Sequence, residues 1–355
     1  MKGVALMPVL FGTIRDDHIQ PTIRKAVDVL EDLNMYDHLY GEAAICADYE
    51  FTQIQLDGLR ATLESVKGNC VPSIVYEGFE DVAESIVAWF KKWLHRFVEY
   101  CKRAFHNLQT MIIHATSKSG EFDEVVKPEK FKSFTVKGYN YTIAGSALDT
   151  SFINDLMSAT AKAVQEISQS DEPKSVVKEF IQEHGIGATI DSLRGKLIKE
   201  DEVSESDWSK TLHTFFRNGD EDAEEIDISY AVAKTISKNV KVFENYLKIC
   251  EVDKKKLEDA SKNIISHVGG QPALVRKYDI EKKERKAVNG PKVDPVLDSL
   301  NDRYVAITEI YTVSNRVLER AIMVYDQYLT AKMRALSEAV RWYIGVLNKA
   351  RGEKK

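Results

Sequence analysis

Apolar residues recur every three or four positions along most of this chain of 355 residues, which is the period of amphipathic helices. Little interrupts the pattern, because the chain has only 8 prolines and 18 glycines. So few breakers over this length favour long helices over many short strands. We therefore expect a mainly all-α fold, an elongated helical bundle in which helix exceeds about half of all residues.

Two long apolar stripes dominate residues 226–355 and predict a long antiparallel helical hairpin. The first stripe, within 226–268, lies on a heptad frame and comprises Ala233, Ile236, Val240, Phe243, Leu247, Cys250, Leu257, Ile264 and Val268. The second begins near Val296 and includes Leu297, Leu300, Tyr304, Ile307, Leu318, Tyr325, Tyr328 and Trp342. Antiparallel pairing buries both stripes, and the glycines and prolines at 269–295 predict a charged linker between the helices.

The preceding residues predict shorter elements. Aromatic and β-branched residues on either side of Lys137-Gly138 predict one small β-hairpin at 131–143. Short helices are expected at 151–168, from Pro173 to Gly185, at 190–197 and after a capping Ser206. Four segments are expected before the helical hairpin of residues 226–355. They are an N-terminal segment at 1–42, a helical region at 43–115, a loop with the small β-hairpin at 116–145, and short helices with an acidic loop at 146–225.

One stretch, residues 80–113, combines aromatic and basic residues on a helical period. Its apolar stripe comprises Ile86, Trp89, Phe90, Trp93, Phe97, Tyr100, Ala104, Leu108 and Met111. Two interpretations stay open: a core helix with basic side chains along its flanks, or a helix that meets a membrane surface, nucleic acid or a partner protein. The candidate binding residues are Trp89, Lys91, Lys92, Trp93, Arg96, Phe97, Lys102 and Arg103.

Charge is distributed unevenly along the chain. The formal net charge is −6, whereas a protein that binds nucleic acid with its whole surface is usually basic. Acidic residues gather at 200–227 and basic residues at 91–103, so local electrostatics matter more than the total. No window approaches the roughly 20 apolar residues of a membrane span, and residues 3–14 make a poor secretory signal. We expect a soluble protein that at most binds a membrane surface.

The sequence carries no recognisable catalytic or metal-binding motif. It has no phosphate-binding P-loop, no His-Glu-x-x-His and no Gly-x-Ser-x-Gly. The four cysteines, Cys46, Cys70, Cys101 and Cys250, are far apart, which predicts isolated reduced thiols. We therefore expect no enzyme activity, no catalytic residue, no metal and no cofactor.

The order of these features resembles helical virion structural proteins, often called internal head proteins, of large contractile-tailed bacteriophages. The resemblance rests on four pieces: YEFTQIQLDGL at 49–59, VAWFKKWL at 87–94 continuing through Phe97, SLRGKL at 192–197 followed by an acidic patch, and the long heptad pair ending in a Tyr- and Ala-rich helix. It covers about residues 43–349 as a pattern rather than as a fixed motif.

The resemblance implies a non-enzymatic component made in the host cytoplasm and packaged in the capsid interior. Its partners would be other virion proteins. Further partners would be other copies of this chain, nucleic acid or a membrane surface. Because such heads are processed after Glu in small-residue contexts, Glu42 before Ala43-Ala44 is a candidate processing site. The acidic net charge does not match a DNA-condensing protein, which favours protein–protein packing. Two alternatives remain: a membrane-surface-binding or pore-associated protein using residues 80–113, and an enzyme with dispersed catalytic residues.

Overall fold

A computed structural model describes residues 72–138, 147–217, 225–289 and 295–352 of the chain. Of these residues, 86% are helical, which confirms the expectation of a mainly all-α protein. The described residues fall into two compact units: 72–88 with 271–281, and 89–270 with 282–352. The N-terminal segment 1–42, with the candidate processing site Glu42, and residues 43–71 of the expected helical region lie outside the described residues.

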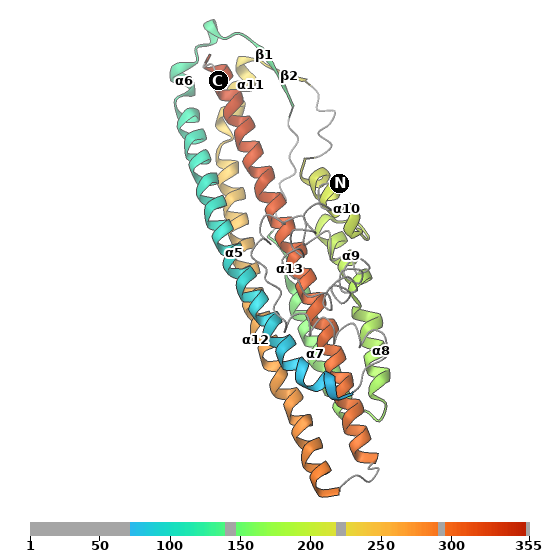
Figure 1. Ribbon diagram of the computed structural model, residues 1–355. Helices are drawn as coiled ribbons and strands as arrows, with labels where there is room; N and C mark the ends of the chain where they lie inside the picture. Colours follow the sequence, from blue (N-terminus) through green and yellow to red (C-terminus); the bar gives the residue numbers. More distant parts are fainter. Residues whose placement is uncertain (1–71, 139–146, 218–224, 290–294, 353–355) are drawn as a thin grey trace, which may run out of the picture. The chain divides into compact units, whose positions relative to one another are not determined.

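The elements follow one another in the order drawn in Figure 1. They are α5 (Pro72–Gly120), α6 (Phe122–Val125), η2 (Pro128–Lys130), β1 (Phe134–Lys137), α7 (Ser151–Gln169), α8 (Pro173–His184), α9 (Ile186–Ile198), α10 (Glu205–Arg217), β2 (Glu225–Ile228), α11 (Tyr230–Lys238), α12 (Lys241–Asn289) and α13 (Pro295–Ala350). Residues 89–120 of α5 and 241–270 of α12 belong to the larger unit, and only these parts are compared with other elements below.

Helix α13, with 56 residues, is the element on which the larger unit is built. It packs against α7, α8, α9, α10 and α11, and it also contacts α5 and α12 (Figure 1). Much of its surface is therefore buried, including Ile310, Leu318, Tyr325, Leu336 and Leu347. A helix that is apolar on several faces is suited to this central position. The hydrophobic core of the unit follows α13 along its length.

Helices α12 and α13 pack antiparallel, as the two stripes predict. The ring centroids of Phe243 and Tyr343 lie 5.3 Å apart, and Asp253 forms an ion pair with Lys332. Helix α5 runs parallel to α13. Trp93, near the start of the part of α5 in the larger unit, donates a hydrogen bond to Asp326, and Glu121, just past the end of α5, pairs with Arg351 farther along α13.

The expected linker at 269–295 is largely helical instead. Helix α12 continues through Gly269-Gly270 and Pro272 to Asn289. A proline inside a helix removes one backbone hydrogen bond, at a cost of about 3 kcal/mol. The long helical segments on either side of the proline can offset this cost. The first stripe is also divided, because α11 ends at Lys238 and α12 begins at Lys241.

The small antiparallel sheet is present, and the described residues pair strands far apart in the sequence; the second half of the hairpin expected at 131–143 lies outside the described residues. Strand β1 pairs with β2 in the register Phe134↔Ile228 and Lys137↔Glu225. Ile228 is fully buried, so the pairing brings an apolar residue of β2 into the core. The Nε1 of Trp342 donates a hydrogen bond to the Lys137 carbonyl, 3.0 Å away, and so ties the strand to α13. Local propensity marks a strand but does not identify a partner that follows about 90 residues later.

The short helices lie close to their predicted positions. Pro173 occupies the first turn of α8 and Gly185 follows its last residue, as expected. Helix α9 begins at Ile186, four residues before the predicted start. Helix α10 begins at Glu205, so Ser206 lies inside its first turn rather than capping it, while the Ser204 hydroxyl donates to Asp207 at 2.7 Å.

Candidate functional site

The apolar side of α5 is part of the protein core. Its buried residues in the larger unit are Phe90, Phe97, Cys101, Phe105, Leu108, Ile112 and Ala115, which follow one another at helical spacing. The buried side of α5 differs from the predicted apolar stripe by a rotation about the helix axis. Tyr100, which was expected in the stripe, is 38% exposed, while Phe105 and Ile112, which were not, are buried. The reason is that α5 contacts both α12 and α13, so its buried face is set by two neighbours.

The two tryptophans of the candidate site are half-buried and packed against neighbouring rings. The Trp93 ring stacks on Phe97 with centroids 4.9 Å apart, and its Nε1 donates a hydrogen bond to Asp326 of α13 at 3.2 Å. Trp89 packs edge-on against Phe90, also with centroids 4.9 Å apart. The hydrogen bond to Asp326 ties Trp93 to α13, whereas both ring contacts are made within α5 itself.

The basic residues of the candidate site lie on the opposite side of α5. Lys91, Lys92, Lys102 and Arg103 are exposed, and Arg96 is half-buried. With the exposed His95 and His106, they form what we call the basic face: Lys91, Lys92, His95, Arg96, Lys102, Arg103 and His106. The structure thus separates the eight predicted contact residues into the aromatic ones, which contact neighbouring rings, and the basic ones.

The basic face has a local excess of positive charge. Between residues 91 and 106 the chain has five Lys or Arg residues and one carboxylate, Glu99, for a net charge of +4. Glu99 accepts a hydrogen bond from Lys102 Nζ at 2.6 Å, and this contact holds the pKa of the Glu99 carboxyl below its usual value. Arg103 Nε reaches the Glu99 backbone carbonyl at 3.3 Å.

The neighbouring helix α12 shows that this excess is not general. Between Lys241 and Lys262 it has six lysines and five carboxylates, for a net charge of +1. Its lysines are balanced by nearby acids, as in the ion pair of Lys254 with Glu258 at 3.0 Å. A charge-balanced helix surface is the usual way to keep a long helix solvated. The basic face of α5 departs from that arrangement.

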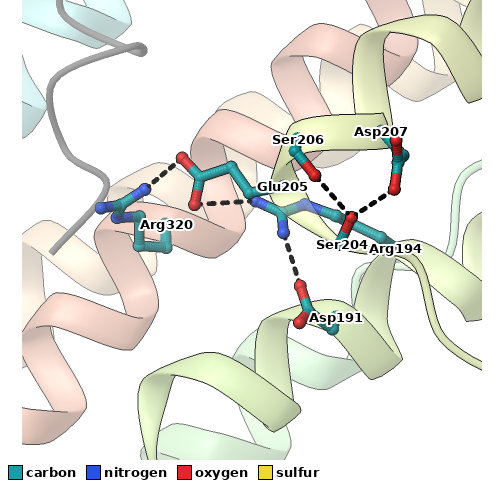
Figure 2. Close-up of polar contacts among 7 residues, drawn as sticks. All are labelled: Asp191, Arg194, Ser204, Glu205, Ser206, Asp207 and Arg320. Carbon is teal, nitrogen blue, oxygen red and sulfur yellow. Dashed lines mark hydrogen bonds and ion pairs between the residues drawn. The ribbon is translucent and has the colours of Figure 1, made fainter. Parts of the chain in front are cut away.

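A second cluster of charges joins α9, α10 and α13. Figure 2 shows Glu205, at the start of α10, between the guanidinium groups of Arg320 and Arg194, at 2.7 and 3.5 Å. Arg194 is only 1% exposed and also donates to Asp191 at 2.6 Å. Its Nε has no hydrogen-bond partner among the residues that the structure describes. Because Arg194 is buried and the partly exposed carboxylates of the cluster pair with protein arginines, the cluster serves to hold three helices together.

The segment SLRGKL at 192–197 contains Arg194 of this cluster and also Gly195, whose role is close packing. A Cβ on Gly195 would lie 2.6 Å from the Asp201 carbonyl oxygen and 2.7 Å from that of Glu200. The chain reverses just beyond, where Lys199 has a left-handed backbone with φ of 64°. The start of the acidic stretch therefore packs directly on α9, which only glycine permits. This feature of the sequence has a structural role.

Sequence analysis missed the charged residues of the core. Asp253 of α12 and Lys332 of α13 are fully buried and paired at 2.7 Å. A signal was present, since both occupy positions that continue the buried three- and four-residue spacing of their helices: Cys250, Asp253 and Leu257 in α12, and Leu329, Lys332 and Leu336 in α13. An ionisable residue on each of two paired stripes indicates an ion pair across them.

The described residues contain neither a metal-binding cluster nor a cysteine thiol of lowered pKa. No group of three His, Cys, Asp or Glu side chains there is arranged to hold a metal ion. Cys101 and Cys250 are free and buried, and burial raises the pKa of each thiol to about 12. A thiol protonated in this way is a weak nucleophile. None of the described helices combines the length and apolar character needed to cross a membrane.

Comparisons of the chain with protein families, with curated proteins and with solved structures gave no match. The role of the protein must therefore be inferred from its own residues and from the sequence pattern.

Proposed function

We propose that this protein is a non-enzymatic structural component of a phage virion, packaged in the interior of the head, which acts mainly through contacts with other virion proteins. The observation that carries a binding role is the arrangement of α5. Its aromatic side is packed into the core, so the helix is held rigid, and its basic face is left exposed. A preorganised surface of this kind binds partners without the entropic cost of ordering a segment.

The virion setting comes from the sequence pattern, and the packing of the larger unit is compatible with it. Long helices that pack laterally around α13 form a rigid body with extended faces. Extended faces suit repeated contacts with neighbouring proteins in an assembly. The free and buried Cys101 and Cys250 fit synthesis in the reducing cytoplasm of a host.

The burial of the α5 aromatic side chains counts against the membrane-surface alternative. An interfacial helix inserts its apolar face among the lipids. In α5, Phe90, Phe97 and Phe105 would first have to leave the core, where each is at least nine-tenths buried. Flotation of the purified protein with anionic liposomes tests this alternative: co-flotation at about 150 mM salt would support it and weaken the proposed function.

Mass spectrometry of purified particles tests the proposed function. The protein should be present in particles after density-gradient purification and nuclease treatment, at a copy number that is constant between preparations. The matched control is the lysate of infected cells, in which a non-structural protein would also be abundant. Abundance in the lysate together with absence from the particles would reject the proposal.

The processing site gives a second, independent measurement. If Glu42 is cut in the head, particles should contain a peptide beginning at Ala43, while the lysate should contain the intact 1–42 segment. A Glu42→Gln variant should enter particles uncut. Full-length protein in mature wild-type particles would show that Glu42 is not a processing site, without affecting the structural role.

A further inference from the structure

We propose that the basic face of α5 binds the phosphate backbone of double-stranded nucleic acid, without preference for sequence. This inference rests on the proposed function only in taking the same face as a contact surface, and it names a partner that the net charge of −6 had disfavoured. The net charge describes the whole chain, whereas binding depends on the field at the contact. The local value on the basic face is +4.

The positive charges on α5 form two rows. At about 100° per residue, Lys91, His95, Lys102 and His106 fall along one line of the helix, and Lys92, Arg96 and Arg103 fall along another. At about 1.5 Å per residue the rows extend over roughly 22 Å. A duplex of that length carries on the order of a dozen phosphate charges. The rows therefore match a ligand with a long, regular series of negative charges.

The composition of the face favours nucleic acid as the partner at this one surface, which leaves the contacts with other virion proteins to the remaining faces of the unit. Protein interfaces depend on aromatic and apolar residues at their centre, and charged residues are depleted there. In the part of α5 within the larger unit, the exposed large apolar side chains are Tyr100 and Ile113. Tyr100 lies toward α13, where it contacts Thr330, and Ile113 lies two turns beyond His106. Between the two rows the contact surface is polar, as phosphate contacts require.

The core beneath the basic face holds α5, and with it the two rows of positive charge, in a fixed position. Trp93 is fixed to Asp326, and Phe97 and Phe105 are buried beneath the cationic turns. The side-chain hydrogen bond and ion pair of Glu99 with Lys102 neutralise one of the cations in the middle of the face. Removing the Glu99 charge should therefore strengthen binding, an effect that damage to the fold would not produce.

Fluorescence anisotropy of the full-length protein with duplexes of about 30 base pairs tests the proposal. Four phosphate contacts predict a slope of log affinity against log salt concentration of about −3.6, which amounts to a loss on the order of a hundredfold between 50 and 200 mM salt. Two duplexes of unrelated sequence should bind within about threefold of each other. Sequence-dependent affinity, or no binding at 50 mM salt, would overturn the proposal.

Two matched variants separate the basic face from charge in general. Neutralising Lys91, Lys92, Lys102 and Arg103 together to glutamine or alanine should weaken binding by about a hundredfold at 50 mM salt. Neutralising Lys241, Lys248, Lys255 and Lys262 of α12, all exposed, makes the same change in net charge and should weaken it less than about threefold. Equal losses in the two variants would show that the contact is not at the basic face.

Glu99→Gln supplies the gain expected only from a contact at this face. It should tighten binding about threefold at 50 mM salt and steepen the salt slope by about 0.9. Unchanged or weaker binding, or tighter binding to anionic vesicles than to duplex, would overturn the proposal. DNA binding by a protein absent from particles would reject the proposed function alone, while a particle protein without DNA binding would reject this inference alone.

Discussion

Lys332 Nζ lies 2.7 Å from Asp253 Oδ2 in the seam between α13 and α12, and both side chains are at most 1% exposed. The other carboxylate oxygen of Asp253 accepts the backbone N–H of Leu148 at 2.6 Å. Lys256, one turn along α12, donates to the Leu148 carbonyl at 2.8 Å. One buried ion pair thus joins two long helices and fixes the segment that leads into α7.

Replacing Lys332 by methionine should lower the free energy of unfolding by about 3–5 kcal/mol. The substitution keeps the length of the side chain but leaves Asp253 as an uncompensated carboxylate inside the seam. Urea unfolding followed by circular dichroism measures the loss.

The double variant Asp253→Asn with Lys332→Met is the matched test of this explanation. It removes both charges, so much of the loss should be recovered, apart from the weakened contact with Leu148. A double variant less stable than Lys332→Met alone would mean that the ion pair is not the source of the loss.

The two sides of α5 should respond differently to substitution. Phe97→Ala removes a buried ring and its stacking on Trp93, which predicts a loss of about 3–5 kcal/mol in the free energy of unfolding. Lys102→Ala removes an exposed side chain whose ion pair with Glu99 is solvated, so stability should change by less than about 0.5 kcal/mol. Thermal unfolding of both variants would reveal a similar loss if Lys102 belonged to the core.

Helix positions were predicted well wherever an apolar period continued for many residues. Helix α13 begins at Pro295, next to the predicted start near Val296, and runs to Ala350, because neither proline nor glycine occurs between residues 296 and 344. The prediction of a linker at 269–295 was wrong because that segment does contain glycine and proline. Gly269-Gly270 and Pro272 are breakers by propensity, and packing and helix cooperativity override propensity in the folded chain.

What depends on partners distant in sequence could not be predicted. The aromatic and basic sides of α5 were visible in its period, but the precise seam, with Phe105 buried and Tyr100 exposed, is set by where two other helices lie. Pairing of β1 with β2 is likewise a tertiary choice. The contact of Arg194 with Glu205 joins two helices, whereas in the sequence Glu205 is one of many acidic residues in the stretch 200–227.

Gly195→Ala should destabilise the protein by about 2 kcal/mol or more. Its new Cβ would meet backbone oxygens of Glu200 and Asp201 at 2.6–2.7 Å, and backbone cannot move aside as a flexible side chain can. Gly187 of the same helix is the control, because no atom of the described part of the chain lies within 4 Å of the Cβ that alanine would add. Gly187→Ala should raise stability by about 0.5–1 kcal/mol through helix propensity. Equal effects in thermal unfolding would argue against the close contact at Gly195.

The half-buried Glu319 of α13 should make stability depend on pH near neutrality. Burial raises the pKa of its carboxyl to about 7, against the opposing effect of Arg316 and Arg320, while an unfolded chain has a value near 4.5. The folded state therefore holds the proton more tightly than the unfolded state. Its contribution to stability is complete below about pH 4.5 and is lost as the pH rises through about 7.

Glu319→Gln should remove this loss, because glutamine stays neutral at every pH. Relative to the wild type, the variant should gain about 1–3 kcal/mol in the free energy of unfolding between about pH 5 and pH 8, a range that allows for partial solvent screening. Glu183→Gln, at a side chain 75% exposed, is the control and should follow the wild type. Urea unfolding at the two pH values measures the difference. If Glu319→Gln and the wild type lost stability in parallel, the carboxylate would be ionised without cost in the folded protein, and the arginines rather than burial would set its charge.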